Sequence, residues 1–64
     1  MENNFSKNLN RVLNERGLTH SQLAKMAGIS PETIKRIIAG KPCQMFIKLQ
    51  IKNALGMSYE ELNN

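Results

Sequence analysis

Hydrophobic residues recur along the chain at spacings of three and four, which is the period of a helix, and no segment alternates as a β-strand does. The first stripe of this kind consists of Phe5, Leu9, Val12 and Leu13. These positions share one face of a helix, which we expect to end before Gly17.

A second helix is marked by its capping residues. Thr19 and Gln22 have the spacing of a capping box, in which each side chain accepts a hydrogen bond from the other residue's backbone N–H. This box predicts a helix over about residues 20–27. Gly28 follows it and can take the left-handed conformation that ends many helices.

A third helix has equally clear ends. Ser30 is a favoured N-cap, and Pro31 follows at the first helical position. The backbone N–H that proline lacks would have no partner within the helix at this position. Gly40 ends this helix, which therefore runs from about residue 30 to residue 39. Only residues 28–30 separate it from the second helix, and so short a link makes the two helices cross steeply, because an antiparallel pair needs a reversing loop.

Two more helices complete an all-α prediction of one domain over residues 1–64. A fourth helix is expected over about residues 44–55, before Gly56. Ser58 and Glu61 form another capping box, which opens a short last helix.

The fourth helix contains more apolar residues than one helix face can hold. One stripe consists of Ile47, Ile51, Ala54 and Leu55, and the surplus is Met45, Phe46 and Leu49. Together with Tyr59, this surplus either contributes to a dimer contact or widens the buried core, and the pattern leaves both interpretations open.

The net charge of +4 favours anionic partners, and its distribution is uneven. Between residues 30 and 52 the basic residues are Lys35, Arg36, Lys41, Lys48 and Lys52, whereas the acidic residue there is Glu32. Positive charge therefore concentrates on the third helix and the segment that follows it.

Other function classes find little support in the sequence. With Cys43 as its one cysteine and His20 as its one histidine, the chain can form neither an internal disulfide nor a four-ligand zinc site. No nucleophile lies at a fitting spacing from a base, so we expect no catalytic residue, no metal, no cofactor and no small-molecule substrate. No apolar run approaches the ~20 residues of a membrane span, and no signal-peptide core opens the chain, which predicts a cytoplasmic protein without membrane contact.

Residues 18–37 resemble the helix-turn-helix of the phage-repressor and Cro family, the XRE-like regulators. The resemblance rests on LTHSQLA at residues 18–24, on Gly-Ile-Ser at residues 28–30, and on Ile34. Residues 54–62 are similar to the start of that family's last helix. The resemblance implies a five-helix, lambda-repressor-like DNA-binding domain with its helix-turn-helix core at about residues 19–39, and a repressor that often acts as a dimer.

The sequence departs from the family pattern in two places. His20 stands where members often have a glutamine that contacts a backbone phosphate, and an imidazole can still donate to phosphate. Leu13 and Ile38 stand where many members place a buried arginine and glutamate. Replacing both partners of a buried ion pair by apolar residues is often neutral or stabilising, so the pair of changes is coherent.

The outward side of the third helix supplies the candidates for base contacts, which are Pro31, Glu32, Lys35 and Arg36. Glu32 and Arg36 lie opposite the apolar face of this helix, and a groove-binding helix presents its first turns to base edges. Arg36 can donate to guanine O6 and N7, Glu32 can accept from cytosine N4, and Pro31 can contact a thymine methyl group. The alternative for Glu32 and Arg36 is an i, i+4 salt bridge on a solvated face.

Phosphate contacts are expected near the N-termini of the second and third helices, because the partial positive charge there attracts anions. The candidate residues are Thr19, His20, Ser21, Ser30, Thr33, Lys41 and Gln44, with Lys35 on the flank of the third helix. Such contacts position a protein on DNA without specifying the sequence.

The sequence therefore predicts sequence-specific binding of double-stranded DNA through the major groove, by a transcriptional repressor. The main alternative is a protein-interaction module of the same fold, such as an antitoxin or antirepressor, against which Lys35, Arg36 and Lys41 argue. Binding of RNA or single strands is a weaker alternative, because the chain lacks the aromatic platforms on which bases stack.

Overall fold

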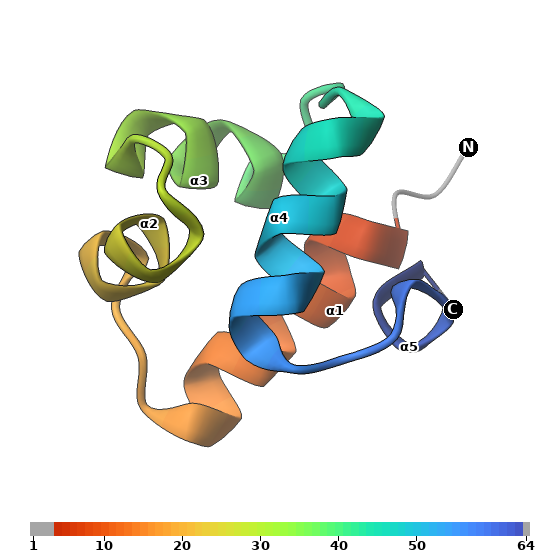
Figure 1. Ribbon diagram of the computed structural model, residues 1–64, viewed down its shortest axis with the longest axis horizontal. Helices are drawn as coiled ribbons and strands as arrows, with labels where there is room; N and C mark the ends of the chain where they lie inside the picture. The colour runs from red at the N-terminus through yellow and green to blue at the C-terminus, as the bar shows by residue number, and fades with distance from the viewer. Residues whose placement is uncertain (1–3, 64) are drawn as a thin grey trace.

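The computed structural model describes residues 4–63, all of whose regular elements are α-helices (Figure 1). The elements are α1 (Asn4–Arg16), α2 (His20–Ala27), α3 (Pro31–Ile38), α4 (Met45–Leu55) and α5 (Tyr59–Asn63). The all-α, five-helix prediction is confirmed, and the helices end within a residue of the predicted positions. Among these residues, no helix has the length and apolar character needed to cross a bilayer.

One apolar core lies between the helices, and every helix contributes to it. Its buried residues are Phe5, Leu9, Val12, Leu13, Leu23, Ala24, Ile34, Ile37, Ile51, Leu55 and Leu62. In Figure 1, α2 and α3 lie on one side of α4 and α5 lies on the other, with α1 behind. The predicted stripe of the first helix is fully buried, as an amphipathic helix requires.

Side chains of α1 bind carbonyl groups at the C-terminal ends of three other helices. The Ser6 hydroxyl donates to the Ile37 carbonyl of α3, and Asn8 Nδ2 donates to the Leu62 carbonyl of α5 at 2.7 Å. Arg16 Nη1 donates to the Leu55 carbonyl of α4 at 2.6 Å. The last carbonyls of a helix have no partner within it, so these side chains supply donors to groups at the helix ends, although the Ile37 carbonyl also accepts from the Gly40 N–H at 2.9 Å.

The start of α5 is held by the predicted capping box. The Ser58 N–H donates to Glu61 Oε1 at 3.0 Å, and the Glu61 N–H donates to Ser58 Oγ at 3.1 Å. These hydrogen bonds from Ser58, helped by the positive charge of Arg16, lower the pKa of the Glu61 carboxyl. Because the folded chain prefers the ionised form, Glu61 stabilises the fold above its unfolded pKa, and this contribution disappears as pH falls through the folded pKa.

We expect Glu61→Gln to remove this pH dependence while keeping the capping hydrogen bond, since a glutamine oxygen also accepts from the N-cap N–H. Between pH 7 and pH 3, chemical denaturation should show that the wild type loses more stability than Glu61→Gln. Glu60→Gln, an exposed neighbour in the same helical turn, is the matched control and should behave as the wild type does. Equal losses in the wild type and Glu61→Gln would contradict the role of the ionised carboxylate.

Candidate nucleic-acid interface

The turn between α2 and α3 redirects the chain within three residues. Gly28 has a left-handed backbone with φ of 72°, and its N–H donates to the Ala24 carbonyl at the end of α2. The Ile29 N–H donates to the same carbonyl at 2.9 Å, and the Ile29 side chain packs against the core. Ser30 then caps α3 by accepting from the Thr33 N–H at 3.3 Å. The turn therefore fixes both the end of one helix and the direction of the next.

The two sides of α3 differ sharply in exposure. Ile34 and Ile37 are buried in the core, whereas Ile38 is half-buried. The four candidates for base contacts are all exposed, namely Pro31, Glu32, Lys35 and Arg36. The rest of the described chain does not cover this side of the helix.

Glu32 and Arg36 do not form the salt bridge that their spacing allows. Among residues 4–63, no ion pair joins their side chains. The charged groups of Glu32 and Arg36 are therefore not paired with each other, and both residues are exposed.

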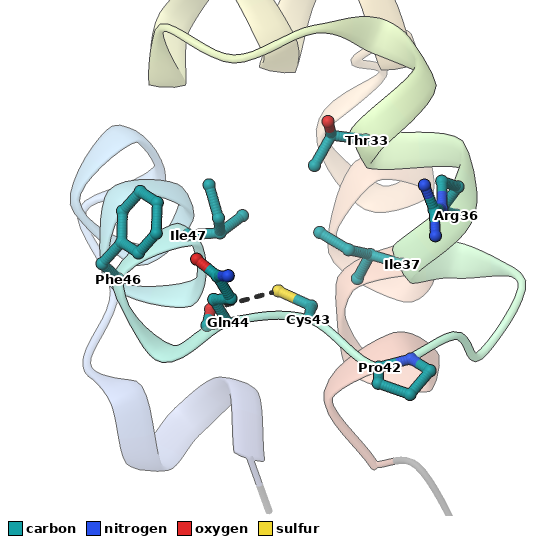
Figure 2. Close-up of a pocket in the computed structure, with 8 residues that line it drawn as sticks. All are labelled: Thr33, Arg36, Ile37, Pro42, Cys43, Gln44, Phe46 and Ile47. Carbon is teal, nitrogen blue, oxygen red and sulfur yellow. Dashed lines mark hydrogen bonds between the residues drawn. The ribbon is translucent and has the colours of Figure 1, made fainter.

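The phosphate candidates lie in two places. Thr19 and Ser21 are exposed and His20 is half-buried, all at the start of α2. Thr33 and Gln44 line one cavity together with Arg36, at the junction of α3 and α4 (Figure 2). The remaining candidates, Ser30 and Lys41, are exposed before and after α3.

Several of these hydroxyl groups also serve as caps. Thr19 Oγ1 accepts from the Gln22 N–H at 3.0 Å, which completes the predicted capping box of α2. Ser30 Oγ and Thr33 Oγ1 lie 2.9 Å apart and share a hydrogen bond. A hydroxyl that accepts a hydrogen bond from an amide keeps its own proton, so the Thr19 hydroxyl can still donate. Of the two hydroxyl protons of Ser30 and Thr33, one forms the bond between these residues and the other can still be donated.

The start of α4 differs from those of α2, α3 and α5. Gln44 is its N-cap but makes no side-chain hydrogen bond to the first turn of the helix. The positive end of the α4 dipole therefore lacks the capping oxygen that α2, α3 and α5 receive, which favours an anion at this place.

The cavity between α3 and the start of α4 has a volume of about 350 Å³ (Figure 2). Its apolar wall consists of Ile37, Pro42, Phe46 and Ile47, and its other residues are Thr33, Arg36, Cys43 and Gln44. Burial raises the pKa of the Cys43 thiol, which is therefore neutral at pH 7, and Sγ donates to the Gln44 carbonyl at 3.3 Å. The sequence pattern did not predict this cavity, since spacing along a helix carries no information about a hollow between two helices.

The surplus apolar residues of α4 are exposed. The exposed fractions are 54% for Met45, 57% for Phe46 and 39% for Leu49, whereas Tyr59 is half-buried. The interpretation that Met45, Phe46 and Leu49 widen the core is therefore wrong. They form an apolar patch on the first turns of α4, which we call the α4 patch.

Among protein-family models, the one described as helix-turn-helix matches residues 9–62. The chain belongs to this helix-turn-helix family. The match confirms the predicted membership of the XRE-like group, whose domains bind DNA. The searches of curated proteins and of solved structures gave no match.

Within this helix-turn-helix domain, we expect Gly28→Ala to cost about 1–2 kcal/mol of stability, measured by urea denaturation. A residue with a Cβ atom is strained in the left-handed backbone conformation of Gly28. No neighbouring atom lies within 4 Å of the added carbon, so the expected cost is backbone strain and not a steric clash. Gly28→Asn should lose less, because asparagine adopts this conformation more readily than alanine. An alanine variant as stable as the wild type would show that the turn can adopt another backbone conformation at residue 28.

Proposed function

We propose that this protein is a sequence-specific transcriptional regulator, most simply a repressor, that acts in the cytoplasm by inserting α3 into the major groove of double-stranded DNA. The observation that carries the proposal is the exposed side of α3, which presents Pro31, Glu32 and Arg36 opposite the buried Ile34 and Ile37. A helix held in this way can reach base edges without moving the core.

The roles of the side chains follow from their chemistry. Arg36 presents a guanidinium that can donate two hydrogen bonds to guanine, and Glu32 presents a carboxylate that can accept from cytosine. Pro31 offers an apolar surface to a thymine methyl group, and Lys35 extends the cationic side of the helix. Together these residues specify the sequence.

Phosphate contacts hold the domain on the duplex from both sides of α3. Thr19, His20 and Ser21 would approach one strand from the start of α2, where the helix dipole favours an anion. Ser30, Thr33, Lys41 and Gln44 would approach the backbone around α3 and at the start of α4. Such contacts raise the affinity for every duplex and make it depend on salt.

Selection from a random duplex library, followed by a salt titration, tests the proposal. Enrichment of one motif is expected, whereas binding of all duplexes alike would contradict sequence-specific recognition. In the same assay, Arg36→Ala should relax the preference at one base position by ~1–3 kcal/mol, because the bidentate contact with a base is lost.

The matched comparison is Lys41→Ala, which removes the same charge from an exposed position beyond α3. It should weaken binding to all duplexes equally. The slope of log affinity against log salt concentration should fall by the amount expected for about one phosphate contact. An Arg36→Ala variant with an unchanged motif would show that another residue contacts the bases.

We further propose that the α4 patch, with Tyr59, is a contact between two copies of this chain on DNA. A standard interface uses roughly 20–30 residues from each partner, and the patch has far fewer, so the contact is expected to be weak in solution. It would form when two copies occupy neighbouring half-sites, which supplies a high effective concentration.

Sedimentation with and without DNA measures this contact. On a palindromic site, Met45→Ser should abolish cooperative binding of the second copy while binding to a single half-site stays unchanged. The matched control is Met26→Ser, which replaces a methionine of similar exposure on α2, 50% against 54%. A strict monomer at high micromolar concentration, without association on DNA, would exclude the dimer.

A further inference from the structure

DNA binding accounts for only some of the residues that line the cavity between α3 and α4. Thr33, Arg36 and Gln44 are polar, and a phosphate group would satisfy them. The wall formed by Ile37, Phe46 and Ile47 is apolar, and a phosphate gains nothing from it. Figure 2 shows Ile37 and Ile47 extending from the two helices into the space between them. The lining therefore suits an occupant with one anionic end and one apolar end.

The charged residue that lines the cavity is a cation, and no acidic residue among residues 4–63 lines it. Arg36 lines it directly. The charge of Lys48, on α4, partly opposes the rise in the pKa of the Cys43 thiol, and Lys48 Nζ lies 5.2 Å from the centre of the Phe5 ring. No acidic residue occurs between Glu32 and Glu60 in the sequence. An anion in the cavity therefore meets attraction from both helices.

We propose that this cavity binds a small amphipathic carboxylic acid, with its carboxylate on Arg36 and an aromatic or branched apolar part against Ile37, Phe46 and Ile47. The volume of about 350 Å³ lies at the lower end of the range of roughly 300–1,000 Å³ typical of small-ligand sites. An inorganic anion would leave the apolar wall in water, and a neutral apolar molecule would leave Arg36 without a partner.

The acid would act as an effector of DNA binding, a consequence that rests on the proposed function. Thr33, Arg36 and Gln44 belong both to the cavity and to the surface assigned to DNA. A carboxylate paired with Arg36 removes the guanidinium from the bases, so acid and DNA exclude each other. By linkage, each ligand lowers the affinity of the protein for the other by the same factor.

Titration of the ¹⁵N-labelled free protein with sodium benzoate, followed by NMR, tests the site without DNA. Benzoate should shift the amide signals of residues 43–47 together with those of Thr33 and Arg36. Acetate lacks the apolar part and benzyl alcohol lacks the charge, so each should bind at least tenfold more weakly. Equal binding of benzyl alcohol, or shifts confined to other parts of the chain, would overturn the proposal.

Two variants separate the contributions of charge and space. Arg36→Ala should weaken benzoate binding at least tenfold, whereas Arg11→Ala, the loss of an exposed arginine on α1, should not. Cys43→Leu fills the cavity without changing any charge and should also prevent binding, while its spectrum reports that the fold is retained. Unchanged benzoate affinity in Arg36→Ala would exclude the assigned carboxylate contact.

The effect on DNA is measured separately, with the duplex motif from the library selection. Saturating benzoate should raise the apparent Kd for DNA of the wild type at least tenfold relative to equal acetate, and should leave that of Cys43→Leu unchanged. Benzoate binding with an unaltered Kd for DNA would overturn the exclusion. If no duplex binds at all, the proposed function fails, and the NMR titration still decides whether the cavity takes the acid.

Discussion

The eight-residue helix α3 keeps one side in water because both of its ends are anchored. At its start, the left-handed Gly28 and the capping Ser30 set the direction in which the helix leaves α2. At its end, the Ser6 hydroxyl of α1 binds the Ile37 carbonyl. An isolated helix of this length is not stable in water. The exposed side of α3 is therefore a property of the whole domain, and every contact assigned to DNA depends on it.

Hydrogen bonds at the helix ends explain how so small a domain stays folded while one side of α3 remains exposed for binding. Capping oxygens hold the starts of α2, α3 and α5, and donors from α1 hold the ends of α3, α4 and α5. Caps of this kind contribute roughly 0.5–2 kcal/mol each, which matters where the core is small. The start of α4 is the exception, because Gln44 places no oxygen on its first turn. This exception coincides with the cavity and the α4 patch.

The surface assigned to DNA and the cavity share Thr33, Arg36 and Gln44. This overlap gives the domain a simple physical means of regulation, since one cation cannot bind a base and a carboxylate at once. The α4 patch adjoins the cavity through Phe46, which belongs to both. A ligand there would also alter the place where a second copy is proposed to dock.

The amino-acid sequence alone determined the helix ends, the capping boxes at Thr19–Gln22 and Ser58–Glu61, and the side of α3 that faces water. These features depend on residues within one or two turns of each other, so their signals are local. Only the tertiary structure decided that Met45, Phe46 and Leu49 are exposed and that a cavity opens between α3 and α4. The donors of α1 likewise reach carbonyls 31, 54 and 39 positions away in the chain. Such pairings depend on how the helices cross, and the period of a single helix does not specify a crossing.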